Sequence, residues 1–166
     1  MAKQIFVAVD LSNLYHCVRK KFKGKKVDFK QLLAWVGDLG TVVHACAYGS
    51  QVKDEAQRFI HCLHANNWAT KYKKVRALEN KRRASWDVGI AIDTIKLINT
   101  NSINTLVLCS ANGDLVDLIE YCADHGVETI VLACGISKNL QAVANTIIEF
   151  PESLLEGIEN VSSIIT

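Results

Sequence analysis

The stretch Ile5-Phe-Val-Ala-Val-Asp10-Leu-Ser-Asn13 decides the fold, because a run of apolar residues ends there at a carboxylate and a polar, helix-starting segment. A short and nearly continuous apolar run predicts a strand that is buried on both faces, as in parallel sheets. Asp10 then stands at the exit of that strand. In open α/β sheets the carboxyl ends of the strands border the ligand crevice, so we expect Asp10 to face a functional site.

The rest of the chain alternates short apolar runs with helical patterns. Strand-like runs cover residues 5–9, 42–48, 68–75, 105–109 and 127–134, with a last short strand at 146–150. Helix-like stretches cover residues 14–22, 29–39, 53–65, 88–98, 115–125 and 138–144. This alternation predicts an α/β fold, a single Rossmann-like domain of three layers with a mostly parallel central sheet. We place the domain at residues 1–150 and expect residues 151–166 to form a short amphipathic helix packed on it or a loosely held tail.

The composition is that of a globular protein. The chain has 166 residues, 49% of them hydrophobic, and a single proline, which argues against disorder. No apolar stretch approaches the roughly 18 residues that a membrane span needs, so we expect a cytoplasmic protein with no membrane partner. The six cysteines contain no CxxC pair and lie mostly in apolar patterns, which is typical of buried free thiols.

The basic residues are unevenly distributed. Thirteen of the nineteen lie in two clusters, within residues 19–26 and 71–83. Such asymmetry favours a polyanionic partner. The alternative is that both clusters are solvated surface with no partner.

Further acidic residues stand at comparable junctions. Asp87 opens a helix after Ser85-Trp86, and Asp114 follows the strand at 105–109 and the turn Ser110-Ala-Asn-Gly113. Three carboxylates at one sheet edge would repel one another unless a cation joined them, and oxygen ligands suit Mg²⁺ or Mn²⁺. The alternative is that Asp10 and Asp87 only cap helices. Asp93 interrupts an apolar helix, where a charge is costly unless it is paired or coordinated.

Other site patterns are missing from the sequence. It contains no GxxxxGK[ST] phosphate loop, no GxGxxG and no GxSxG elbow, so kinase, dehydrogenase and hydrolase-triad interpretations lose support.

Three segments together resemble the NYN domain family of PIN-like nucleases. They are the opening stretch to Asn13, the segment Trp86-Asp-Val-Gly-Ile-Ala-Ile-Asp93, and the segment Leu106-Val-Leu-Cys-Ser-Ala-Asn-Gly-Asp-Leu-Val-Asp-Leu118. Their order and spacing are similar to the family's over roughly residues 4 to 150. The resemblance implies a compact Rossmann-like sheet that binds Mg²⁺ or Mn²⁺ at its carboxyl edge and cleaves RNA phosphodiesters.

The resemblance also implies roles for individual residues. The catalytic carboxylates would be Asp10, Asp87 and Asp114, with Asp93 as a further metal ligand. The groups expected to contact RNA are Asn13, Ser110, Asn112, Lys71, Lys73, Lys74, Arg82 and Arg83. Tyr72 and Trp86, interleaved with this charge, could stack an unpaired base or belong to the core.

This chain departs from the family pattern at two places. Asn112 stands where the family usually has an aspartate, and Ala84-Ser85 replaces the usual Lys-Gly ahead of Asp87. The lost carboxylate weakens the case for two tightly held metal ions, so that catalysis would be slow, single-metal or absent.

Two function classes follow. The first is a metal-dependent endoribonuclease that acts on RNA, with single strands as the expected substrate, and a homo-oligomer is left open. The alternative is a non-catalytic module that binds RNA or a protein through a degenerate acidic site.

Overall fold

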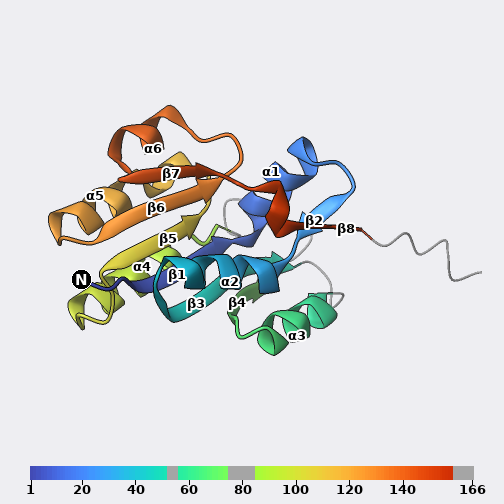
Figure 1. Ribbon diagram of the computed structural model, residues 1–166, viewed down its shortest axis with the longest axis horizontal. Coiled ribbons are helices and arrows are strands. Elements are labelled where there is room, and N and C mark those ends of the chain that lie inside the picture. Colours follow the sequence, from blue (N-terminus) through green and yellow to red (C-terminus); the bar gives the residue numbers. More distant parts are fainter. Residues whose placement is uncertain (52–55, 75–84, 159–166) are drawn as a thin grey trace, which may run out of the picture.

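The protein is built on a parallel sheet whose strand order reverses at its first strand. The computed structural model describes residues 1–51, 56–74 and 85–158. Within this part of the chain, six strands are hydrogen-bonded in the order β4-β3-β1-β5-β6-β7, and every neighbouring pair is parallel (Figure 1). The strands are β1 (Gln4–Asp10), β3 (Thr41–Gln51), β4 (Ala69–Lys74), β5 (Thr105–Cys109), β6 (Glu128–Ala133) and β7 (Thr146–Glu149).

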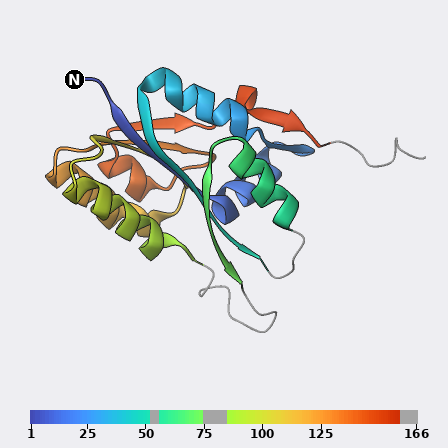
Figure 2. The same cartoon turned by 90° about the horizontal axis from the view of Figure 1, so that it is seen from below.

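Helices cover both faces of this sheet. One face packs against α1 (Leu11–Lys21), α2 (Phe29–Leu39) and α3 (Gln57–Ala65), and the other against α4 (Asp87–Asn99), α5 (Val116–Asp124) and α6 (Lys138–Val143). Figure 2 shows α2 and α4 on opposite sides of the sheet. Alternate residues of β1 point into the two cores: Val7 and Val9 into the first, Phe6 and Ala8 into the second. The three-layer α/β prediction is therefore confirmed.

The C-terminal segment differs from the helix or loose tail that the sequence led us to expect. After Pro151 the chain forms a 3-10 helix, η4 (Glu152–Leu154), and a strand, β8 (Leu155–Gly157), that pairs antiparallel with β2 (Lys25–Val27). Buried Leu154 ties this segment to the core. Lys26 lies opposite Glu156 across the two strands and forms an ion pair with it, and such a cross-strand pair of opposite charges supports the pairing. Lys25 forms an ion pair with Glu152 of η4. Residues 159–166 lie outside the described part of the chain.

All six cysteines are free, and four of them are buried. Complete burial raises the pKa of Cys109 to about 12, so this thiol stays protonated and inert at neutral pH. Among the described residues, the longest apolar helices fall short of what a membrane crossing requires.

Candidate active site

Asp10 and Ser110 lie side by side at the point where the strand order reverses. β1 pairs with β5 up to Val9 and Cys109, so the residues that follow both strands emerge together at the carboxyl edge. The Asp10 side chain is only 8% exposed, and its Oδ1 accepts a hydrogen bond of 3.3 Å from the Asn13 backbone N–H. Asp10 thus caps α1, as one of the two sequence interpretations held, and it does so within the crevice expected for this fold.

Asp87 reaches the same place from the start of α4. The helix begins at Asp87 itself, and Trp86 precedes it. The Trp86 indole N–H donates to the Gly49 carbonyl at 2.7 Å, and the Lys73 ammonium lies 4.2 Å from the ring centroid. Gly89 has no side chain to block the indole, since a Cβ there would lie 2.5 Å from it. These contacts anchor the first turn of α4 against β3, and they fix where Asp87 points.

Asn112 joins the two halves of the site. Its side-chain amide donates to both carboxylate oxygens of Asp87 at 2.9 Å, and its backbone N–H donates to the Ser110 hydroxyl at 3.2 Å. The Asn112 Oδ1 accepts from the Asp114 backbone N–H at 3.0 Å and caps the 3-10 helix η3 (Gly113–Leu115). Asn112 therefore holds the loop after β5 against the start of α4.

Asn13 fixes the same loop from the other side. Its Oδ1 accepts a hydrogen bond of 2.9 Å from the Ala111 backbone N–H. Since the Asn13 backbone also donates to Asp10, this one residue links the exit of β1 to the exit of β5. Asn13, Ser110 and Asn112 thus form a hydrogen-bonded network around the two carboxylates.

The electrostatics of this network favour a cation. Burial raises the pKa of Asp10, and the negative charge of Asp87 raises it further, while hydrogen bonds from Asn13, Ser12 and Ser110 oppose the rise. A buried carboxylate beside a second one is costly as a bare pair of anions. A divalent cation between them would remove that cost.

The oxygens present fit Mg²⁺ or Mn²⁺. Asp10 and Asp87 supply carboxylate oxygens, and the Ser110 hydroxyl adds a neutral oxygen beside Asp10, whereas Asn112 turns its NH₂ group toward Asp87. Mg²⁺ is usually bound by one or two carboxylates together with water and substrate phosphates. Within the described ranges, no three His, Cys, Asp or Glu side chains converge. The donor set is therefore that of a site completed by water or substrate oxygens.

Asp114 and Asp93 are placed differently from this pair. Asp114 is exposed at the rim, one residue beyond Gly113, and it contacts the network only through its backbone N–H. Asp93 accepts a hydrogen bond of 2.8 Å from the buried Tyr48 hydroxyl and pairs with Lys71 at 2.7 Å. Burial alone would raise the pKa of Asp93, but the hydrogen bonds from Lys71 and Tyr48 outweigh it and lower the pKa. The charge of Asp93 is thus already balanced by Lys71.

The basic residues expected to bind RNA have mixed placements. Lys71 is engaged by Asp93, and Lys73 donates to the Ser85 carbonyl at 2.8 Å beside the Trp86 ring. The Lys74 side chain and all of Arg82 and Arg83 lie outside the described part of the structure. Their contact with RNA stays a prediction.

Sequence reasoning missed the residues that support the carboxylates. Trp86 was considered only as a stacking or core side chain, and Gly49, Gly89 and Tyr48 were not considered. One signal was available: Trp86 and Gly89 are three residues apart, one helical turn, a spacing at which a glycine admits a large ring.

Comparison with known proteins agrees with this architecture. The sequence model of the NYN domain family matches residues 4–156, and the chain therefore belongs to the NYN domain family. This membership indicates a nuclease-like, RNA-related function, and NYN and PIN-like nucleases typically use divalent metals.

A solved structure shares the fold. The crystal structure of a protein of unknown function from Vibrio parahaemolyticus superposes with a TM-score of 0.81 at 23% sequence identity, covering 93% of this chain and 97% of that chain. No curated protein sequence matches this chain.

Proposed function

We propose that this NYN domain is a metal-dependent ribonuclease that hydrolyses RNA phosphodiester bonds, with Asp10 and Asp87 holding Mg²⁺ or Mn²⁺. The observation that carries the proposal is the buried Asp10 carboxylate, which has Asp87 as a like-charged neighbour at the switch point of the sheet. Within the described ranges no cation forms an ion pair with either carboxylate, so the two neighbouring charges are costly, and carboxylates perturbed in this way cluster at functional sites.

Each residue of the network has a defined part in this proposal. Asp10 and Asp87 are the anionic ligands, and Asp114 adds a third carboxylate at the rim. Asn13 keeps Asp10 in place through its backbone N–H, while Asn112 keeps Asp87 in place through its side-chain amide. A bound cation supplies Lewis acidity, which activates water and neutralises charge on the leaving oxygen. The chain's own contribution is to hold two charges rigidly beside a substrate phosphate.

RNA single strands are the proposed substrate. In this proposal, basic residues from the two clusters would contact phosphates and so position a strand without reading its sequence. Affinity should therefore fall with salt, with a log–log slope of about −0.7 per neutralised phosphate for a single strand. A flat response would remove nucleic acid as the ligand.

A second candidate function rests on Asn112. Because its amide donates to both oxygens of Asp87, that carboxylate is partly satisfied without any cation. The same site could thus hold RNA without cutting it. A binding module is the function that would remain if the acidic pair takes up no metal.

A cleavage assay separates the two candidates. Labelled single-stranded RNA is incubated with the protein and Mn²⁺, Mg²⁺ or EDTA, with Asp10→Asn in parallel. Asp38→Asn is the matched control, since Asp38 is exposed and lies near the start of β3, at the opposite edge of the sheet. The ribonuclease requires cleavage that needs metal, is lost in Asp10→Asn and persists in Asp38→Asn. RNA binding that survives EDTA, with no cleavage in any metal, would establish the binding module instead.

A further inference from the structure

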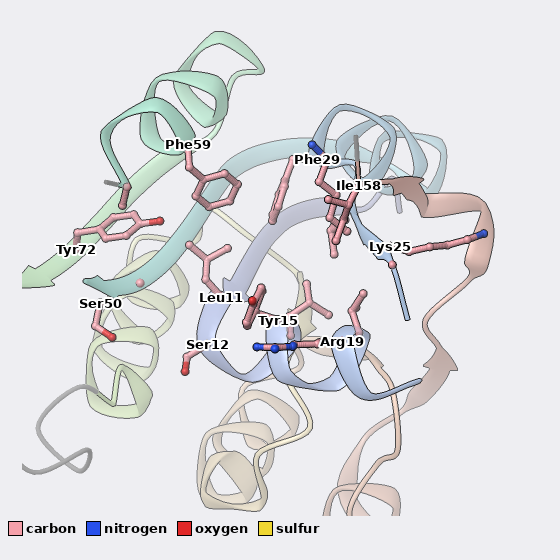
Figure 3. Close-up of a pocket in the computed structure, with 17 residues that line it drawn as sticks. Leu11, Ser12, Tyr15, Arg19, Lys25, Phe29, Ser50, Phe59, Tyr72 and Ile158 are labelled. Atoms are coloured by element: carbon pink, nitrogen blue, oxygen red, sulfur yellow. The ribbon is translucent and has the colours of Figure 1, made fainter. Parts of the chain in front are cut away.

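A large cavity lies on the α1 side of the sheet and is distinct from the acidic network. Its volume is about 730 Å³, within the range of pockets that hold small organic ligands. Figure 3 shows α1 forming one wall and Phe29 and Phe59 facing it from across the opening. Tyr72 and Ser50 close the end nearest the carboxyl edge of β3 and β4.

Four aromatic rings, together with aliphatic side chains, line this cavity. Phe29 and Phe59 pack edge to face with centroids 5.6 Å apart, and Tyr15 and Tyr72 add two further rings. Tyr15 is 59% exposed and Phe59 is 39% exposed, so large apolar surface is left in contact with solvent here. Exposed aromatic faces of this kind are where unpaired nucleobases stack, because every base has a π-face.

The cavity includes the two residues that follow Asp10 in the chain. Leu11 and Ser12, which follow Asp10 in the chain, line one end, and Arg19 lines the same wall further along α1. The rise of 1.5 Å per helical residue places Ser12 and Arg19 about 10 Å apart. A strand whose phosphate lies at Asp10 would therefore carry its neighbouring base along this wall.

Charge at the rim matches a phosphate backbone. Arg19, Lys25 and Lys26 are among the residues that line the cavity. Lys25 and Lys26 are paired with Glu152 and Glu156, so Arg19 is the cation that we assign to a phosphate. An aromatic interior with a cationic edge suits a nucleotide better than it suits an uncharged apolar ligand.

From these observations we propose that the cavity is a nucleobase subsite, in which Tyr15 and Phe59 hold an unpaired base next to the phosphate at Asp10. The inference rests on the proposed function only in taking RNA as the ligand, and it does not require cleavage. It also explains a preference for single-stranded RNA by this cavity, because a base within a duplex cannot enter the cavity without being extruded.

The test is a binding measurement in EDTA, so that cleavage does not interfere. Fluorescence anisotropy compares a labelled decauridylate with an oligomer of the same length whose central nucleotides carry no base. The intact oligomer should bind about tenfold more tightly to the wild type, and Tyr15→Ala should reduce that preference to near unity. Phe59→Ala should act in the same way, and Tyr15→Phe should retain the preference.

The control variant is Tyr121→Ala, which removes a partly buried ring from α5 on the opposite face of the sheet. It should leave the preference for the intact oligomer unchanged. Tyr15 is exposed, so its replacement tests the cavity even if Phe59→Ala does not fold.

Two outcomes would overturn the proposal. One is equal affinity of the wild type for the intact and base-free oligomers. The other is a change in self-association on Tyr15→Ala, measured by sedimentation velocity, with no change in base preference, which would assign the cavity to a second copy of the chain. If the wild type prefers the intact oligomer but does not cleave RNA, the proposed ribonuclease activity is refuted and the subsite is not. Metal-dependent cleavage without base preference would refute the subsite alone.

Discussion

Helix α4 carries two carboxylates whose surroundings are opposite. Asp87, at its first residue, lies near Asp10 and receives hydrogen bonds from the neutral amide of Asn112. Asp93, six residues later, is paired with the Lys71 cation and with the Tyr48 hydroxyl. Six residues rotate a helix by about 600°, so the two side chains cannot share one face. Among the described residues, Asp87 has no cation paired with it, whereas Asp93 is paired with Lys71.

This difference separates a candidate ligand from a structural ion pair. Around Asp87 the protein raises the pKa of the neighbouring Asp10, chiefly by burial, and so makes the anionic pair costly. Around Asp93 it lowers the pKa through Lys71 and Tyr48 in spite of burial. An acid in apolar surroundings therefore does not by itself identify a metal site. What identifies one is the lack of a partner of opposite charge.

The largest expected effect comes from removing the charge of Asp10. Asp10→Asn keeps an oxygen that can accept from the Asn13 N–H but removes one anionic ligand, so metal-dependent cleavage should fall about a hundredfold, or about 2.7 kcal/mol in the barrier. The metal-free variant should also melt at a higher temperature, because a costly buried charge is gone. Single-turnover cleavage and calorimetric melting in EDTA measure the two effects. A lower melting temperature would contradict the electrostatic argument.

Asn112→Asp should sharpen the contrast by removing the side-chain amide that donates to both oxygens of Asp87. A carboxylate added beside Asp87 raises repulsion in the metal-free protein and adds a ligand, so Mn²⁺ affinity should rise about tenfold, or about 1.4 kcal/mol. Titration calorimetry with Mn²⁺ measures it. Gln31→Glu, the same amide-to-acid change on the exposed side of α2, should leave Mn²⁺ affinity as it is. Unchanged affinity in Asn112→Asp would mean that Asp87 is not a ligand.

Asp93→Ala should affect stability and leave metal binding alone. It deprives the buried Tyr48 hydroxyl of its acceptor, which costs about 1 to 3 kcal/mol of unfolding free energy. Urea denaturation measures that cost, and the same substitution in a Tyr48→Phe background should cost less. Weaker Mn²⁺ binding by Asp93→Ala would instead show that Asp93 is a metal ligand, as the family resemblance implied.

The smallest effect is the pH dependence of stability. The pKa of Asp10 is higher in the folded protein than in the unfolded chain, so the folded state binds more protons between the two values. Stability from this group is present below the unfolded pKa of about 3.8 and is lost as pH rises through the folded pKa. The lowered pKa of Asp93 acts in the opposite direction, and its contribution is lost as pH falls. Urea denaturation in EDTA should show Asp10→Asn gaining on the wild type as pH rises, and a constant difference would contradict the raised pKa.

The sequence predicted the central sheet well, because its middle strands β1, β5 and β6 are buried on both faces. The run at 5–9 and the run at 105–109 became adjacent strands, and that pairing alone brought Asp10 to Ser110. β2 and β8 were not predicted, since three-residue strands rich in Lys and Glu carry no apolar period. They pair through backbone contacts between segments more than a hundred residues apart, which no local pattern reveals.

The sequence predicted the carboxylates of the site, but it did not predict the residues that hold them in place. A carboxylate at a strand exit can be read from one segment, whereas the Asn112–Asp87 contact joins residues that only the fold brings together. Asp93 was recognised as a charge that needed a partner, but its partner Lys71 lies on a strand 22 residues earlier. The local sequence shows that a buried carboxylate needs a partner, but it does not show which residue the partner is.

The close approach at Gly49 has a consequence for how other members of the family are compared with this chain. A Cβ at this position would lie 2.7 Å from the Tyr72 ring and 3.1 Å from Leu11, while the Gly49 carbonyl holds the Trp86 indole. Gly49 thus allows Tyr72 and Leu11 to pack in the wall of the cavity, and it also anchors the start of the helix that carries Asp87. Chains with a larger residue here should have rearranged one or the other, so the identity of this residue is a marker for which homologues share the combined arrangement.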